Sequence, residues 1–169
     1  MHVFLTGDIQ IGKSTVINKT TALLNKTIGG FQTYFGSDRG SPTKPLYINS
    51  AAQPKVFCQE NIVVQFRGED FPLIYNEKFD IYGVELIQRA REKSQLIVMD
   101  ECGNLEQFSI SFQSKILDTL DEKTPILGVV KQASWGWTDR IRNHPQVKLI
   151  TVTRENRNQL PELIADYIG

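Results

Sequence analysis

The feature that most constrains this chain is a glycine-rich loop near its N-terminus. Residues 7–14 fit the pattern G-x-x-x-x-G-K-[ST] without a mismatch. The segment before the loop, residues 2–6, is short and apolar, as a buried strand would be. The residues that follow Lys13 carry apolar side chains at helical spacing. Because a strand, such a loop and a helix in this order form a phosphate-binding loop, the chain is predicted to bind a nucleoside triphosphate.

The chemistry of the loop follows from the residue types at its fixed positions. Glycines allow unusual backbone dihedrals and a close approach of N–H groups to an anion, and the helix dipole points at the same place. Lys13 can reach the β- and γ-phosphates, and Ser14 can supply a hydroxyl ligand to magnesium. We therefore expect Mg2+ as the cofactor. The expected nucleotide-binding residues are Gly7, Asp8, Ile9, Gln10, Ile11, Gly12, Lys13, Ser14 and Thr15.

The remaining sequence alternates between strand-like and helix-like segments. Continuous apolar runs at 96–99, 126–130 and 147–152 have strand length, and amphipathic segments separate them. This alternation predicts the α/β class, a P-loop NTPase with a mainly parallel sheet covered by helices on both faces. Between residues 31 and 76 the pattern changes to short β-like pieces separated by turns, which predicts an antiparallel β meander inserted after the first helix. We expect one P-loop NTPase domain over residues 1–169, with this insertion inside it.

The segment boundaries can be predicted from local signals. We expect the first helix to run from Lys13 to about Asn25 and to be ended by Gly29 and Gly30. A second helix is expected up to about Lys93, with Ile81, Val84 and Ile87 on its apolar face. Two further helices are expected from the apolar spacing near residues 112–120 and 160–168. The β-like pieces of the meander are 31–35, 46–48, 56–59 and 62–66.

Two acidic residues, Asp100 and Glu101, directly follow the apolar run 96–99. Open α/β sheets bind their ligands at the carboxyl ends of the strands, where an acid can hold magnesium through water. We therefore expect Asp100 and Ser14 at the metal, with Glu101 as the general base that orients the attacking water. The segment between residues 31 and 93 leaves room for an extra strand between the loop strand and the strand that carries Asp100.

Three further motifs resemble a known family. The stretches Phe31–Thr33, Met99–Ser109 and Thr151–Arg157 are similar to G-F-x-T, D-E-I-G-x-M-E-x-F-S and V-T-x-E-N-R of the small nucleoside-triphosphatases. This is the P-loop NTPase group that includes the cancer-related nucleoside-triphosphatase. The resemblance implies slow, magnesium-dependent hydrolysis of several nucleoside triphosphates, with Lys13 and Glu101 as catalytic residues.

The motifs add three possible site residues, Glu106, Asn156 and Arg157. Glu106 is alternatively an acid favoured by a helix dipole, and Arg157 the partner in a structural salt bridge. The chain also departs from the family pattern. After Thr33 the family has an acidic residue and an arginine, whereas the nearest arginine here is Arg39. Cys102 and Leu105 replace the usual Ile and Met, and residues 38–76 match poorly, so the meander could serve substrate selection or a partner surface.

Composition narrows the set of partners. The formal net charge is zero, so no global field favours nucleic acid or an anionic membrane, and we expect neither as a partner. Only two cysteines occur, which fits a reduced, cytoplasmic protein. The oligomeric state is unknown from the sequence. The loop with Trp135 and Trp137 follows a predicted strand, where it could sense a γ-phosphate, stack on a base, or anchor a surface loop.

These observations predict that the protein hydrolyses nucleoside 5′-triphosphates, such as ATP and GTP, to diphosphate and phosphate with broad base specificity. Two alternatives remain open. A nucleoside or nucleotide kinase would use the same loop with a second substrate as the acceptor. A nucleotide-dependent switch or binding module would use slow hydrolysis to reset a partner interaction.

Overall fold

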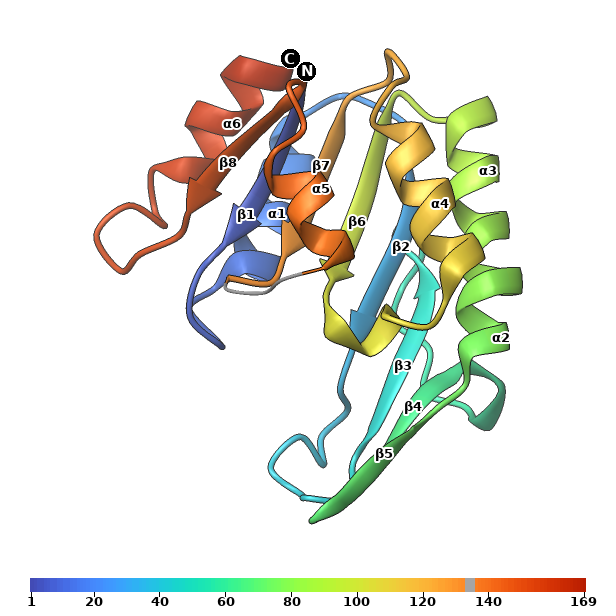
Figure 1. The fold of residues 1–169 in the computed structure, drawn as a ribbon. Coiled ribbons are helices and arrows are strands. Elements are labelled where there is room, and N and C mark those ends of the chain that lie inside the picture. Colours follow the sequence, from blue (N-terminus) through green and yellow to red (C-terminus); the bar gives the residue numbers. More distant parts are fainter. Residues whose placement is uncertain (133–135) are drawn as a thin grey trace.

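One mixed sheet organises the chain. The computed structural model describes residues 1–132 and 136–169, and within them eight strands occur in the order β5-β4-β3-β2-β6-β7-β1-β8 (Figure 1). The pairs β2–β6, β6–β7, β7–β1 and β1–β8 are parallel, and β2–β3, β3–β4 and β4–β5 are antiparallel. The strands are β1 (His2–Thr6), β2 (Ile28–Tyr34), β3 (Pro45–Ser50), β4 (Ile62–Arg67), β5 (Asp70–Ile74), β6 (Leu96–Cys102), β7 (Ile126–Val130) and β8 (Val147–Thr151).

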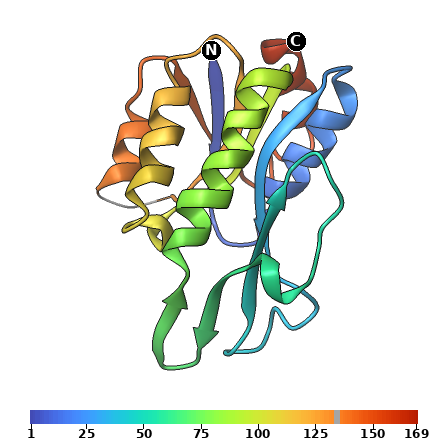
Figure 2. The same cartoon turned by 90° about the vertical axis from the view of Figure 1, so that its right-hand side faces the viewer.

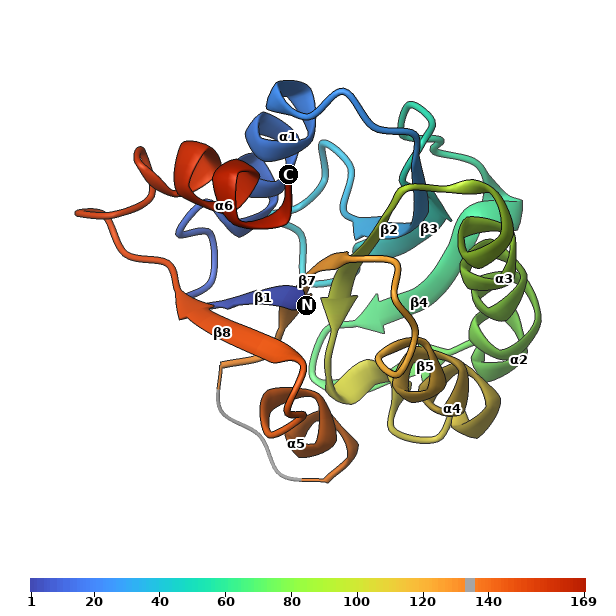
Figure 3. The same ribbon diagram turned by 90° about the horizontal axis from the view of Figure 1, so that it is seen from above.

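Helices cover both faces of the parallel part of the sheet. α1 (Lys13–Leu23) and α6 (Leu160–Ile168) lie together on one face. α3 (Val84–Lys93), α4 (Ile110–Thr119) and α5 (Trp137–Arg142) cover the other, as the view from above shows (Figure 3). No helix among the described residues is long and apolar enough to cross a membrane. The predicted class, an α/β sheet with helices on both faces and an antiparallel meander after the first helix, is confirmed.

The apolar core divides into two clusters, one on each face, because successive strand residues point to opposite sides. Phe4 packs in the cluster beneath α3, α4 and α5, where the Phe112 ring centroid lies 5.0 Å from that of Phe31. Val3 and Leu5 point the other way and pack against α1 and α6. Burial on both faces therefore explains the uninterrupted apolar strands.

The extra strand expected between the loop strand and the Asp100 strand is present, but its origin differs. β7 lies between β1 and β6, and it comes from residues 126–130, later in the chain. The strands of the 31–76 segment lie on the far side of β6 and continue the sheet there (Figure 2). A parallel crossover from β6 through α4 delivers β7 into the gap.

Several predicted boundaries are wrong. Gly29 and Gly30 do not end the first helix but lie inside β2, while α1 already ends at Leu23. The piece 56–59 forms no strand; a 3₁₀ turn, Gln59–Asn61, begins at its end. β5 was not expected, because Pro72 and exposed Phe71 obscure its pattern; a proline fits here because β5 is an edge strand.

The second predicted helix is also divided. A short α2 (Asn76–Lys78) leads through a π-helical turn, Phe79–Gly83, into α3. The wider turn changes the residue spacing, so Ile81 points to solvent while Phe79 and Ile87 are buried. The apolar face predicted from Ile81 is therefore wrong.

Candidate active site

The glycine-rich loop connects β1 to α1 at the edge where the parallel strands have their carboxyl ends. Gly7 and Gly12 have φ angles of 142° and 114°, which side chains rarely allow. A Cβ atom at Gly7 would also lie 2.8 Å from the Val152 carbonyl oxygen. Gly12 is the N-cap of α1, so the loop ends where the helix dipole is positive. The loop backbone thus lies against the segment after β8, and a helix N-terminus in this position is suited to an anion.

Two side chains at the start of α1 line this loop. The Lys13 ammonium donates to the carbonyl oxygens of Gly7 and Asp8, at 2.7 and 2.8 Å, and so lies across the loop opening. The Ser14 hydroxyl donates to the Asp100 carboxylate at 2.7 Å. The structure therefore brings together Lys13, Ser14 and Asp100, which the sequence places in two distant segments.

β2 holds the acidic pair in place. Gln32 is the in-register neighbour of Asp100. The Thr33 hydroxyl donates to the Asp100 carbonyl oxygen at 3.1 Å and accepts from the Glu101 N–H at 3.2 Å. The peptide bond between Asp100 and Glu101 is cis. Thr33 thus fixes the backbone of both acids. The sequence motif that contains Thr33 does not predict this contact, because the contact depends on the pairing of β2 with β6.

Burial changes the proton affinities of both acids. Burial raises the pKa of Asp100 to about 6, although the Ser14 hydrogen bond acts in the opposite direction. Burial also raises the pKa of Glu101, while the cationic Lys13, Lys131 and Arg39 lower it in part. Glu101 is therefore a stronger base than an exposed glutamate and is surrounded by positive charge.

Glu106 is a third acidic residue near the site, and it is more buried than Asp100 and Glu101. Its side chain is only 4% exposed and accepts a hydrogen bond from the Gly103 N–H at 3.1 Å. Burial, together with the negative charge of Glu101, raises the pKa of Glu106 to about 8. Glu106 is the last residue of a 3₁₀ turn, Asn104–Glu106, which lies between β6 and α4. At neutral pH this carboxyl group is mostly protonated, and it lies close enough to Glu101, near the end of β6, for the two charges to interact.

Asn156 and Arg157 belong to the segment between β8 and α6. The Asn156 side chain accepts from the Thr153 N–H at 2.8 Å and donates to the Thr151 carbonyl oxygen at 2.9 Å, which closes a turn. The Arg157 guanidinium donates to the Ile11 carbonyl oxygen at 3.1 Å and contacts the phosphate loop. Arg157 is thus tied to the loop backbone, and Asn156 shapes the turn that presents it.

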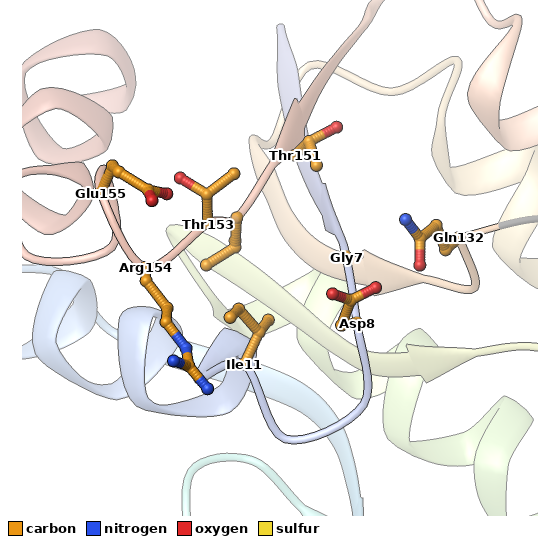
Figure 4. A pocket seen from close by; sticks show the side chains of 9 residues that line it. Gly7, Asp8, Ile11, Gln132, Thr151, Thr153, Arg154 and Glu155 are labelled. Carbon is orange, nitrogen blue, oxygen red and sulfur yellow. The ribbon is translucent and has the colours of Figure 1, made fainter.

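A cavity of about 500 Å3 opens between the phosphate loop and the segment after β8 (Figure 4). Side chains from the loop, from the end of β7 and from the β8–α6 segment surround it in the close view. It is wide enough for a ligand part that extends beyond the loop. Its lining residues are Gly7, Asp8, Ile11, Gln132, Thr151, Val152, Thr153, Arg154 and Glu155.

Of the two tryptophans considered from the sequence, Trp135 lies outside the described residues. Trp137 begins α5, and its indole N–H donates to the Gly103 carbonyl oxygen at 3.0 Å. Its ring packs against the core cluster beneath α4 and α5. Trp137 therefore anchors α5 to the backbone between Glu101 and Glu106.

Comparison with known proteins gives a consistent result. A protein-family model described as NTPase matches residues 2–165. The chain is 30% identical to the nucleoside-triphosphatase THEP1 of Thermofilum pendens, over 99% of this chain and 95% of that protein. It is 29% identical to the cancer-related nucleoside-triphosphatase of Homo sapiens, over 96% of this chain and 94% of that protein.

Solved structures show the same fold. The crystal structure of THEP1 from Aquifex aeolicus superposes with a TM-score of 0.81 at 22% identity and covers 100% of this chain and 99% of that one. The solution structure of a human cancer-related nucleoside triphosphatase has a TM-score of 0.78 at 25% identity, and the match covers 99% of this chain and 97% of that one. The overall fold of this chain is therefore similar to those of the Aquifex aeolicus and human proteins.

Proposed function

The chain belongs to the NTPase family, and from this premise we propose that it hydrolyses nucleoside 5′-triphosphates to diphosphate and phosphate, with magnesium as cofactor. Full-length relatives are named nucleoside-triphosphatases, so the chain is an enzyme of this class. The observation that carries the detailed proposal is the 2.7 Å hydrogen bond between Ser14 and Asp100, next to Lys13. It joins the phosphate loop to the acidic strand end, the pairing of residues that holds magnesium in P-loop NTPases.

The oxygen atoms of Ser14 and Asp100 suit magnesium, which prefers hard oxygen ligands and retains several waters. When bound there with the nucleotide, the ion would neutralise charge on the β- and γ-phosphates. Lys13 and the N–H groups of the loop would stabilise the remaining negative charge that develops on the transferred group. These residues thus account for triphosphate binding and for most of the electrostatic stabilisation.

Glu101 is proposed as the group that orients the attacking water and accepts its proton. Its raised pKa makes it more basic, and Thr33 holds its backbone near the end of β6, at the edge of the sheet that also carries the phosphate loop. Only the ionised form of Glu101 can accept a proton, so hydrolysis should rise as pH increases through its pKa. No acceptor other than water is needed in this scheme.

The cavity beside the phosphate loop is proposed to receive the nucleoside. Its polar lining includes the side chains of Asp8, Gln132 and Arg154, which together carry both donors and acceptors. Such a mixture does not favour one base strongly, which supports broad specificity. We likewise propose that residues 1–169 act as one domain, in the cytoplasm and without a nucleic-acid partner.

The decisive measurement is release of labelled γ-phosphate from ATP, GTP, CTP and UTP, alone and then with a panel of nucleosides and nucleoside monophosphates. Hydrolysis predicts one phosphate released per triphosphate consumed without any co-substrate. Faster transfer of label to an added acceptor than to water would replace the hydrolase with a kinase. Acceleration only by a macromolecular fraction of a cell extract would instead indicate a switch.

Glu101→Gln should separate binding from chemistry. The amide keeps the size of the side chain and some hydrogen bonding but cannot accept a proton, so kcat should fall by about 10²-fold or more. Affinity for a non-hydrolysable triphosphate, measured by calorimetry with magnesium, should change little. The matched control is Glu162→Gln on exposed α6 surface, which should retain parental kcat. Parental turnover in Glu101→Gln would remove Glu101 from the mechanism.

A further inference from the structure

Residues 51–58, which connect β3 to the turn before β4, form a loop that contacts Gln32, the strand neighbour of Asp100. Its backbone is held by side chains from the neighbouring strands. The Gln32 amide donates to the Gln53 carbonyl oxygen at 2.9 Å, and the buried Asn49 amide donates to that of Pro54 at 2.8 Å. The Tyr34 hydroxyl both donates to and accepts from the backbone of Val56, each at 2.7 Å. The backbone on both sides of Lys55 is therefore fixed.

Strand register shows which face of the sheet this loop covers. Gln32 and Asp100 are parallel neighbours, so their side chains point to the same face. The Asp100 side chain meets Ser14 at the start of α1, so that face is the one carrying the phosphate loop. Tyr34, two residues after Gln32, points the same way, and the Lys55 ammonium lies 5.3 Å from its ring centroid.

We propose that Lys55 is a second cation for the terminal phosphate, supplied by the same chain from the side of the site opposite the phosphate loop. This inference rests on the proposed function, and it assigns a role to the meander that the family motifs leave undefined. Lys13 approaches from α1, whereas Lys55 approaches from the β3–β4 connection beyond β2. A positive charge at this position would increase the affinity for a triphosphate more than that for a diphosphate, because the diphosphate lacks the terminal phosphate group.

Electrostatics support this placement. The positive charge of Lys55 lowers the pKa of Asp100, so the ammonium lies within electrostatic range of the proposed metal ligand. A purely structural role is the alternative, in which the lysine only covers the Tyr34 ring. An exposed cation–π contact of this kind is weak, and it would not by itself require a backbone held on both sides of the lysine.

The meander contains a natural control. Lys44 also lies over aromatic rings, 5.1 Å from the Phe35 centroid and 5.5 Å from that of Phe66. Phe35 follows Tyr34 directly, at the end of β2. Lys44 is not among the charges that shift the pKa of Asp100 or Glu101. Replacing Lys44 therefore removes a comparable cation–π contact without removing charge from the site.

The test compares the binding of β,γ-imido-ATP and ADP, each with magnesium, by calorimetry. Lys55→Met keeps the apolar cover of the Tyr34 ring but removes the charge, so the Kd for β,γ-imido-ATP should rise about tenfold and that for ADP less than twofold. Lys55→Arg should restore most of the preference for the triphosphate. Lys44→Met should leave both constants unchanged.

Three results would overturn the proposal: equal weakening of both nucleotides by Lys55→Met, no weakening of either, or the same loss in Lys44→Met. The binding measurement does not depend on turnover. A parent protein that binds the triphosphate analogue but releases no phosphate from ATP would contradict the proposed function alone. A parent that hydrolyses ATP, with an unchanged triphosphate preference in Lys55→Met, would contradict the role of Lys55 alone.

Discussion

At the scale of single residues, Glu106 is a carboxylic acid buried beside the site, and its ionisation in the folded protein is unfavourable. Backbone hydrogen bonds and the charge of Lys131 compensate only part of the cost of an ionised carboxylate in so buried a position, and this carboxylate also faces the charge of Glu101. Its folded pKa of about 8 lies above the ordinary glutamate pKa of 4.5, so between these two pH values the folded protein binds a proton that the unfolded chain releases. The contribution to stability is complete below pH 4.5 and is lost as pH rises towards 8.

Replacing Glu106 with glutamine should remove this pH dependence. The amide stays neutral and its oxygen can still accept from the Gly103 N–H. From pH 5 to pH 8 the free energy of unfolding of the parent should fall relative to Glu106→Gln, by up to about 1.4 kcal/mol per pH unit. Urea unfolding at pH 5, 6.5 and 8 measures the difference. Parallel pH profiles of the two proteins would show that Glu106 ionises normally.

Residue roles were predictable from sequence where they depend on spacing along the chain. The sequence places Lys13 and Ser14 at the start of the helix, and the pair Asp100 and Glu101 at a strand end, because each motif is local. Thr33 and Lys55 could not be assigned in this way. Their positions depend on the register of β2 against β6 and on a loop clamped by side chains from two strands.

At the scale of elements, β2 connects the parallel and antiparallel parts of the sheet. Its two adjacent glycines explain why the sequence pattern predicted a helix end there instead of a strand. Adjacent glycines after a helix normally indicate its end. In β2 they permit close packing instead. A Cβ at Gly29 would lie 2.8 Å from the Ala90 Cβ in α3, and one at Gly30 would lie 2.0 Å from the Val98 carbonyl oxygen in β6. Only the tertiary contacts distinguish these two uses of glycine.

Gly30→Ala is expected to destabilise the protein by about 3 kcal/mol, since the new methyl group meets the β6 backbone and Gly30 has a positive φ. The measurement is urea unfolding at neutral pH. Gly40→Ala is the matched control, because a Cβ there has no neighbour within 4 Å, and its stability should stay within about 0.5 kcal/mol of the parent. Equal stability of Gly30→Ala and Gly40→Ala would mean that β2 shifts freely away from β6.

At the scale of the whole molecule, the site is assembled from strand ends and loops that are far apart in sequence. The phosphate loop follows β1, the acids end β6, Thr33 comes from β2 and Arg157 from the segment after β8. The alternation of apolar runs was enough to predict a parallel sheet covered on both faces. It did not predict the strand order, because the position of β7 between β1 and β6 depends on a crossover and not on any local pattern.

This assembly predicts that nucleotide binding stabilises the fold as a whole. A ligand that binds only the folded state at one hundred times its Kd should raise the free energy of unfolding by about 2.7 kcal/mol. We expect this gain for β,γ-imido-ATP with magnesium, measured by urea unfolding, and a smaller gain when EDTA removes the metal. Lys13→Ala removes the cation that lies across the loop, so each tenfold loss of affinity should reduce the gain by about 1.4 kcal/mol. Lys19→Ala, an exposed position on the same helix, should keep the full gain because its charge lies away from the loop. Equal stabilisation of the parent and Lys13→Ala would show that the nucleotide binds elsewhere on the molecule.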